Sequence, residues 1–233
     1  MTGGSGVIGA AICVLLAQRG FHVLVHANRN VDRAAELTQT IIEGGGSAEP
    51  VCFDVTDRSK CFDVLTPIVQ STPVQVIVHN AGVHGDAPLA GMSGEQWDNV
   101  IDVSLNGFYN VVQPLLLNMI ATRWGRIISM SSVAAILGNR GQANYAAAKA
   151  GLHGATRALA VEVASRGITA NVVAPGIIDS EMASGFSQEQ ISAMVPMKRA
   201  GRGQEVAAMV GFLASDDAGY ISGQIIGVNG GMV

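Results

Sequence analysis

The sequence has few charged residues, and this scarcity excludes several classes of protein. Charged residues make up 14% of the 233 residues, while hydrophobic residues make up 48%. Disordered chains show the opposite balance, because they lack the apolar surface that folding must bury. The formal net charge is −4, whereas nucleic-acid-binding proteins usually carry a basic face. We therefore expect an ordered protein, long enough to fold without disulfides, with no nucleic-acid partner.

Cysteines and long apolar runs are also scarce. The sequence has three cysteines, at Cys13, Cys52 and Cys61. Their spacing fits neither a metal site nor a disulfide framework, so we expect reduced thiols and no bound metal. The apolar run over 111–117 is broken by Gln113 and Pro114 and falls far short of the roughly 18 residues of a membrane helix. No signal peptide is visible, and we expect a cytoplasmic protein that does not bind membranes.

Glycine, in contrast, is abundant, and apolar runs alternate with helical patterns along the whole chain. The 29 glycines are about twice the usual share of roughly 7% and indicate many tight turns. Strand-like runs rich in Val and Ile cover 22–26, 49–53, 74–79, 126–130, 169–174 and 225–228. Helical spacing covers 10–18, 34–43, 97–122, 145–165 and 204–214. Continuous apolar strands separated by helices predict a doubly wound parallel α/β sheet, Rossmann-like, as a single domain over residues 1–233.

A glycine-rich turn stands at the start of the chain, over Thr2–Gly9. Such a turn normally follows a strand and opens a helix, whose free N–H groups and positive end bind a pyrophosphate. Only Met1 precedes it here, so the first strand is either absent or missing from the sequence. An ordinary loop is the alternative, but the apolar strand that follows within one βαβ-sized unit favours a dinucleotide site.

The residues after the next strands predict the type of dinucleotide. Enzymes that use NAD place a carboxylate at the end of the second strand, on the ribose hydroxyls. This chain has Asn28 and Arg29 there, and Arg29 suits a 2′-phosphate, which favours NADP(H) over a merely solvated arginine. Asp54 ends the next strand and Asn80-Ala81-Gly82 the one after it. They suit adenine and ribose contacts, with simple turn chemistry as the alternative.

Three residues suggest acid–base chemistry at a carbonyl group. Tyr145 and Lys149 are four apart in a helical stretch and so share a face. We expect the lysine charge to lower the tyrosine pKa from roughly 10. Such a tyrosine can protonate a carbonyl oxygen that Ser132, just after a strand, polarises. A Tyr-x-x-x-Lys pair alone is common on helix surfaces, but here it joins the glycine turn and the Asn-Ala-Gly strand end in order.

With these motifs, the chain resembles the short-chain dehydrogenase/reductase family, and in particular bacterial 3-oxoacyl-[acyl-carrier-protein] reductases. The resemblance runs over essentially the whole chain. Its most specific stretches are 125–128, 138–151, 171–176 and 228–232. It implies an NADPH-dependent oxidoreductase of fatty acid biosynthesis and lipid metabolism. It also implies a homotetramer with the C-terminal residues at subunit contacts.

The resemblance implies a role for each matching position. Tyr145 matches the catalytic acid, Lys149 the residue that holds the nicotinamide ribose and assists the tyrosine, and Ser132 the carbonyl-orienting hydroxyl. The expected cofactor contacts are Gly3, Ser5, Ile8, Gly9, Asn28, Arg29, Asp54, Val55, Asn80, Ala81, Gly82, Tyr145, Lys149, Pro175, Gly176, Ile178 and Ser180. Arg123 and Arg166 match basic residues that meet the acidic carrier protein, with solvated helix ends as the alternative.

Two internal positions depart from the family pattern. Val7 replaces the middle glycine of the turn, where a β-branched side chain could crowd the pyrophosphate or forbid a needed backbone angle. Ser104 replaces the catalytic asparagine that anchors a relay water, and we expect it to serve less efficiently.

The sequence therefore predicts NADPH-dependent reduction of a 3-oxoacyl thioester, carried by an acyl-carrier protein, to the 3-hydroxyacyl form. One alternative is a dehydrogenase of another alcohol or ketone. The other is a weakly active subunit of a hetero-oligomer, which Val7 and Ser104 would explain.

Overall fold

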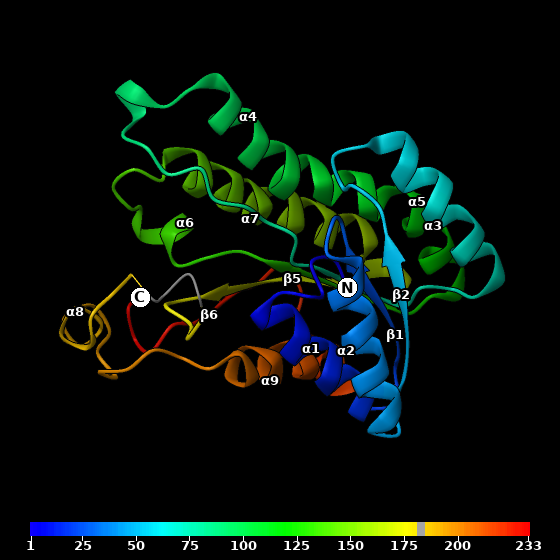
Figure 1. Cartoon of the computed structure of the whole chain (residues 1–233). Helices are drawn as coiled ribbons and strands as arrows, with labels where there is room; N and C mark the ends of the chain where they lie inside the picture. Colours follow the sequence, from blue (N-terminus) through cyan, green and yellow to red (C-terminus); the bar gives the residue numbers. More distant parts are fainter. Residues whose placement is uncertain (181–184) are drawn as a thin grey trace.

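In the computed structural model, which describes residues 1–180 and 185–233, the strands run parallel through the middle of the molecule (Figure 1). The strands are β1 (His22–Ala27), β2 (Ser47–Cys52), β3 (Val76–His79), β4 (Gly125–Met130), β5 (Ile168–Pro175) and β6 (Ile225–Val228). β1 pairs with β2, while β3, β4, β5 and β6 pair in that order, and each of these pairs is parallel. The predicted parallel sheet is confirmed.

The N-terminal residues lie between β1 and β3 and bond to both strands. Met1 accepts a hydrogen bond from the backbone N–H of His26 (3.1 Å), and Gly4 donates one to the His26 carbonyl (2.8 Å). On the other side, Thr2 donates to the carbonyl of Val78 (3.0 Å). This short segment thus connects the two-stranded sheet with the four-stranded sheet. It places the glycine turn where β1 and β3 lie on either side of it.

Helices cover both faces of the sheet (Figure 1). One face carries α1 (Val7–Gln18), α2 (Val31–Glu43) and α9 (Gly203–Leu213), and the other carries α3 (Arg58–Ser71), α4 (Gly94–Ile101), α5 (Gly107–Thr122) and α7 (Ala143–Val163). Two shorter helices are α6 (Ala134–Leu137) and α8 (Gln188–Met194). The arrangement is the expected doubly wound α/β fold.

Alternation along the strands builds one hydrophobic core on each face. In β4, Ile127 packs into the core with α5 and α7, while Ile128 packs into the core with α1 and α9. In β5, Ala170 packs into the core with α5 and α7, while Val173 packs into the core with α1 and α9. Successive side chains of a strand point to opposite faces, so a strand covered on both faces reads as the continuous apolar run seen in the sequence.

Among the described residues, the structure adds α3 and the short helices α6 and α8 to the predicted pattern and divides one predicted helix. α3 was not predicted; Pro67 lies inside it, and proline is disfavoured in helix interiors. Its signals were Asp57 as N-cap, whose side chain accepts from the N–H of Lys60, and the buried residues at 61, 65 and 69. The single helix predicted over 97–122 is α4 and α5 separated by a π-helical segment, Asp102–Asn106.

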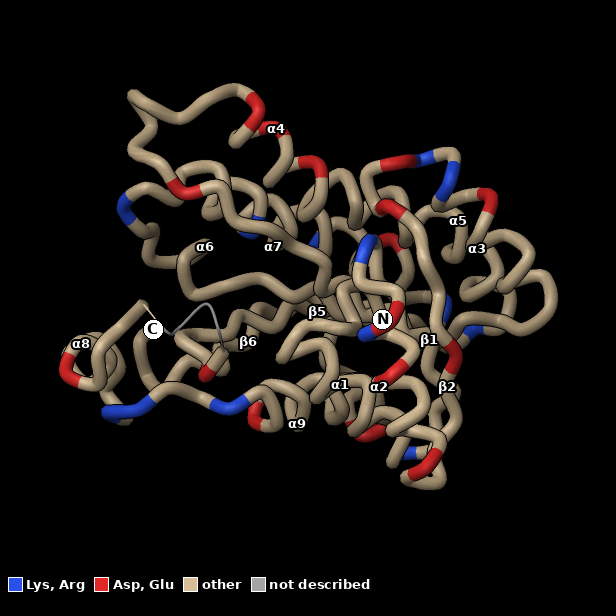
Figure 2. Tube along the Cα trace, in the orientation of Figure 1, with Lys and Arg blue, Asp and Glu red and all other residues tan. Residues whose placement is uncertain are grey.

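Charged positions are distributed around the periphery, with basic and acidic residues intermixed on the outer helices and loops (Figure 2). Cys13 and Cys61 are buried and Cys52 is exposed, and all three are free thiols. Within the described ranges, no helix is long and apolar enough to cross a membrane.

Candidate active site

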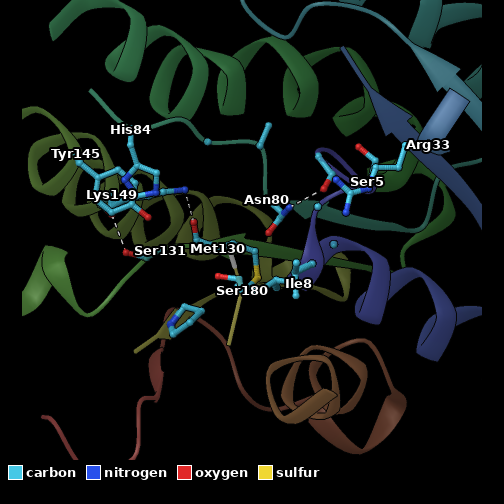
Figure 3. A pocket seen from close by; sticks show the side chains of 17 residues that line it. Ser5, Ile8, Arg33, Asn80, His84, Met130, Ser131, Tyr145, Lys149 and Ser180 are labelled. Atoms are coloured by element: carbon cyan, nitrogen blue, oxygen red, sulfur yellow. Dashed lines mark hydrogen bonds between the residues drawn. The ribbon is translucent and has the colours of Figure 1, made fainter. Parts of the chain in front are cut away.

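A cleft of about 340 Å³ opens at the carboxyl ends of β3, β4 and β5, where open α/β sheets bind ligands. The glycine turn and α1 form one end of the cleft, and the first turns of α7 form the other (Figure 3). The described lining residues are Gly3, Ser5, Gly6, Val7, Ile8, Gly9, Arg33, Asn80, Ala81, Gly82, His84, Met130, Ser131, Tyr145, Lys149, Pro175 and Ser180. Most of the predicted cofactor contacts are therefore brought together.

The N-terminus of α1 presents unpaired backbone donors to this cleft. The first turn of any helix lacks intrahelical acceptors for its N–H groups, and at α1 no side chain caps them and no acidic residue stands among them. Gly3 has φ +59°, which favours glycine, and a side chain at Gly9 would collide with the carbonyl of Gly3. These two glycines let the backbone close tightly around an anion, as a pyrophosphate requires.

Val7 does not strain this turn. It is the first residue of α1, with helical backbone, and it follows the N-cap residue Gly6. The expectation that a β-branched residue at position 7 could forbid a needed backbone angle is therefore wrong, because the left-handed residue of the turn is Gly3. The Val7 side chain still lines the cleft and is exposed.

Two polar side chains from neighbouring strands fix the glycine turn. His26 accepts a hydrogen bond from the Gly3 N–H at Nδ1 (3.1 Å) and donates from Nε2 to the carbonyl of Phe53 (2.8 Å). Burial lowers the pKa of His26 to about 4, so its ring is neutral at neutral pH and Nδ1 can accept. Asn80 donates to the carbonyl of Gly3 (3.0 Å). Sequence reasoning treated His26 only as the end of a strand and missed this supporting role.

Asn28, Arg29 and Asp54 gather beyond the ends of β1 and β2, outside the described lining of the cleft. Burial by itself would raise the pKa of Asp54, but hydrogen bonds from Thr56 and Asn28, together with the charge of Arg29, hold it below its usual value. The Asp54 carboxylate is therefore ionised, and it already accepts hydrogen bonds from Thr56 and Asn28. Val55, the next residue, is buried and its carbonyl accepts from Asn110 (2.9 Å).

A second arginine lies nearer the glycine turn than the sequence suggested. Arg33, in the first turns of α2, lines the cleft with Ser5 and Gly6 (Figure 3). Sequence reasoning named only Arg29. The missed signal was a second basic residue four positions later, in the first turn of the helix that follows β1.

Tyr145 lines the other end of the cleft, and Ser132 lies outside the described lining, next to the lining residue Ser131. Ser132 accepts a hydrogen bond from the N–H of Ala134 (3.2 Å), and its hydroxyl acts on the phenol of Tyr145 so as to lower the tyrosine pKa. The phenol group lies half-buried at the start of α7. This pair is the arrangement that polarises and protonates a carbonyl oxygen.

Lys149 lies one turn further along α7 and points beneath Tyr145. Its Nζ donates to the carbonyl of Met130 (2.9 Å) and lies 5.8 Å from the centre of the tyrosine ring. Burial lowers the pKa of Lys149 to about 8. Gly82 makes room for the ammonium group, because a side chain there would come within 2.9 Å of Nζ.

The expected direction of the Tyr145 pKa shift is wrong. Burial raises the pKa of Tyr145, the hydrogen bond from Ser132 opposes that shift, and the charge of Asp86 adds to it. Lys149 does not lower it, because its ammonium is directed to the Met130 carbonyl. At neutral pH the phenol is therefore protonated and ready to act as an acid.

Ser104 is buried beside Lys149, in the π-helical segment between α4 and α5. Its hydroxyl has no hydrogen-bond partner among the described residues, and both this hydroxyl and the Lys149 Nζ lie against Gly82. π-Helical turns occur often at functional sites. An orphaned buried hydroxyl next to an ammonium group suits a bound water, which would satisfy both.

The segment after β5 closes the cleft from below. Pro175 and Ser180 line it, and the Ser180 hydroxyl donates to the carbonyl of Ile178 (3.1 Å). Gly176 and Ile178 lie outside the described lining. Gly176 packs so closely on Asn229 that a side chain would come within 2.8 Å of its Cα, and Ile178 is buried beside Gly201.

Comparison with known proteins identifies the family. A family profile described as enoyl-(acyl carrier protein) reductase matches residues 4–233. The chain belongs to the short-chain dehydrogenase/reductase family. Its short-chain dehydrogenase/reductase relatives include the 3-oxoacyl-[acyl-carrier-protein] reductase FabG of Aggregatibacter actinomycetemcomitans, 43% identical over 235 residues that cover 100% of this chain and 97% of the relative. The enzyme of the same name from Thermotoga maritima is 40% identical over 239 residues, covering 100% and 96%.

A solved structure of a protein named for a different substrate has the same short-chain dehydrogenase/reductase fold. The crystal structure of a putative gluconate dehydrogenase from Agrobacterium tumefaciens matches with a TM-score of 0.95 and 32% identity, covering 99% of this chain and 93% of that chain. The fold is thus common to enzymes named for different substrates, and the substrate must be argued from the site.

Proposed function

We propose that this protein is an NADPH-dependent reductase that converts a 3-oxoacyl thioester of an acyl-carrier protein into the 3-hydroxyacyl form. The grouping of Tyr145 and Lys149, with Ser132 acting on the Tyr145 phenol, carries the proposal, because Tyr145 and Lys149 line the same cleft as the open N-terminus of α1. The relatives named 3-oxoacyl-[acyl-carrier-protein] reductase support this substrate class over the full length of the chain.

The residues of the cleft fit a dinucleotide phosphate. The glycine cradle and the free N–H groups of α1 suit the pyrophosphate, and Asn80 and Lys149, which line the same cleft, would bind ribose hydroxyls. No carboxylate stands at the end of β1, whereas Arg29 and Arg33 offer guanidinium groups for a 2′-phosphate. These features favour NADP(H) over NAD(H).

Each catalytic side chain then has a defined task. When bound, NADPH supplies the hydride that the carbonyl carbon accepts. The Ser132 hydroxyl orients and polarises the carbonyl oxygen, and Tyr145 Oη gives that oxygen its proton. Lys149, an ammonium group below a pKa of about 8, would hold the hydroxyls of the nicotinamide ribose. A water between Lys149 and the Ser104 hydroxyl would return the proton.

Arg123 and Arg166 are the proposed contacts of an acidic carrier protein. Arg123 ends α5 in the left-handed region (φ 54°), and its Nη2 donates to the carbonyl of Ser165 (3.1 Å), next to Arg166. Both are exposed, at the opposite end of the 21-residue helix α7 from Tyr145, about 30 Å away at 1.5 Å per residue. A carrier held there would serve the cleft of another subunit.

A cytoplasmic homotetramer is the proposed assembly. The helices α5 and α7 expose Tyr109, Leu117 and Val161 to solvent. Large apolar side chains that gather on exposed helix faces are typical of subunit interfaces. An oligomer would cover them and would also bring the arginine pair of one subunit near the cleft of a neighbour.

The test is NADPH oxidation by the purified protein with an acetoacetyl thioester. We expect turnover with this substrate and little with an enoyl thioester or with gluconate and NADP⁺. Turnover with gluconate instead would support an alcohol dehydrogenase. NADPH binding without turnover of any substrate would support a weakly active subunit of a hetero-oligomer.

Tyr145→Phe provides the matched variant for this assay. It keeps the ring that lines the cleft and removes only the hydroxyl group that would donate the proton. Because general acid–base groups contribute on the order of 10²–10⁴-fold, we expect that loss in turnover with NADPH affinity unchanged. Near-normal turnover would remove Tyr145 from the mechanism.

A further inference from the structure

A histidine that the catalytic scheme does not use covers the ring of Tyr145. The two rings stack with their centres 4.6 Å apart and their planes 22° from parallel. His84 lies on the loop after β3 and lines the same cleft as Tyr145 and Lys149 (Figure 3). Ser132 contacts the phenol oxygen, so His84 is in contact with a part of the tyrosine that the catalytic pair leaves open.

The loop that carries His84 is fastened to the start of α7. The buried side chain of Asn144 donates to the carbonyl of Gly85 (2.9 Å), and Gln142 donates to the Asp86 carboxylate (2.7 Å). The backbone N–H of Ala87 adds a bond to the carbonyl of Gly141 (2.9 Å). Because three bonds join the two segments, the stacking is a built feature of the cleft and not a chance contact of a free side chain.

Charged groups surround the stacked pair on two sides. On the same loop, an Asp86 oxygen lies 3.8 Å from His84 Nδ1. On α7, Lys149 lies beyond the tyrosine ring, and Arg140 is exposed on the loop just before that helix. The negative charge of Asp86 makes ionisation of Tyr145 harder. A proton on His84 would counter that charge next to the phenol and would ease donation of the phenol proton.

We propose that His84 is a positioning residue that holds the Tyr145 ring in place by stacking and, when protonated, assists proton donation by Tyr145. The proposal rests on the proposed function, since it needs Tyr145 as the acid. The ring-stacking part is independent of the substrate, and the pH-dependent part is measured on the reaction itself.

Stacking is tested first, on the protein without substrate, by NMR of the histidine ring protons. His84→Phe assigns the His84 signals by their disappearance. We expect these signals to shift downfield in Tyr145→Leu, because a stacked aromatic ring shields them. An unchanged shift would overturn the proposal whatever the protein reduces, and a failed reductase assay leaves this measurement interpretable.

The role in catalysis is tested by single-turnover reduction of an acetoacetyl thioester across the pH range in which histidines change charge, roughly pH 5–8. In the parent we expect the rate to rise as the pH falls. His84→Ala should lower the rate about tenfold at every pH, since misplaced catalytic groups lose rate steeply. His84→Phe should restore the rate at the alkaline end but lose the rise toward acid pH.

Two further variants distinguish an effect of the charge beside His84 from an effect on folding. Asp86→Asn keeps the stacked rings on an exposed loop and should raise the rate, because the charge of Asp86 makes ionisation of Tyr145 harder. His22→Phe is the control, since His22 is exposed and pairs with Glu49 at 3.8 Å in the same way, away from the cleft. Any one of three results would overturn the proposal. The His84→Ala rate could be within twofold of the parent, the His84→Phe rate could be no higher than that of His84→Ala, or His84→Phe could keep the rise in rate toward acid pH.

Discussion

The Nε2 of His79 lies 2.9 Å from the carbonyl oxygen of Ser104. A carbonyl only accepts, so Nε2 carries the proton and Nδ1 faces the hydroxyl of Thr2 (3.4 Å). Thr2 in turn accepts from the N–H groups of Asn80 and Ala81. One neutral imidazole thus connects the glycine turn at one end of the cleft with the π-helical segment beside Lys149 at the other.

Acid is expected to destabilise the fold through two buried histidines. Burial lowers the pKa of His79 to about 3 and that of His26 to about 4, whereas both titrate near 6.5 when unfolded. Between those values the unfolded chain binds more protons, so the free energy of unfolding falls as the pH drops below about 6.5 and levels off below the folded pKa values. Each histidine contributes a slope of up to about 1.4 kcal/mol per pH unit. Urea unfolding from pH 7 to pH 4 measures it.

His79→Asn supplies the control for this measurement. The shorter amide takes the place of Nδ1, loses the bond to the Ser104 carbonyl and does not titrate. We expect lower stability than the parent at pH 7 and a shallower loss toward pH 4. An equally steep loss would show that other groups carry the acid sensitivity.

Gly9→Ala is expected to abolish cofactor binding. The new methyl group would collide with the Gly3 carbonyl, so the turn would have to open and its N–H groups would no longer converge. NADPH affinity measured by fluorescence titration should fall by at least about 100-fold, the equivalent of roughly 3 kcal/mol. Gly94→Ala is the matched control, because nothing lies within 4 Å of the added carbon at the start of α4, and both affinity and stability should be retained.

Preference for NADPH over NADH is expected to depend on Arg29 and Arg33 together. Each guanidinium is exposed, and Arg33 lines the cleft. Arg29→Ala and Arg33→Ala should each weaken NADPH binding by about tenfold or more, the scale of a charge-assisted hydrogen bond, and leave NADH binding unchanged. Lys60→Ala, which removes an exposed cation on α3, is the control. Equal losses for NADPH and NADH would mean that the arginines contact the shared part of the cofactor.

Ser104 substitutions are expected to change turnover more than stability. The hydroxyl has no partner among the residues that the structure describes, so Ser104→Ala breaks no hydrogen bond among them. If this hydroxyl holds a relay water, the variant should lose turnover by about tenfold, the worth of roughly one hydrogen bond. Ser104→Asn should raise turnover with little change in NADPH affinity. Stopped-flow reduction and thermal unfolding measure the two effects, and a rate unaffected by Ser104→Ala would exclude the relay.

The sequence determined the parallel α/β fold and the position of most of the cleft. The apolar runs of β4 and β5 and the glycines around α1 are local signals, and they predicted strands covered on both faces and an anion-binding turn. Spacing also placed Tyr145 and Lys149 on one helix face. α3 was not predicted: its buried residues recur every four positions, but a proline, which is disfavoured in helix interiors, lies inside it.

Only the tertiary structure decided how the side chains of the cleft act on one another. The pKa of Tyr145 rises because burial and Asp86 act on it while Lys149 is directed to the Met130 carbonyl, and no spacing along α7 reveals where that ammonium points. Likewise, Arg33 and His84 lie near the motifs in sequence, but only the tertiary structure shows that their side chains line the cleft. Local patterns fix secondary structure through short-range sterics and burial, but electrostatics depends on distances through space that only the packed sheet sets.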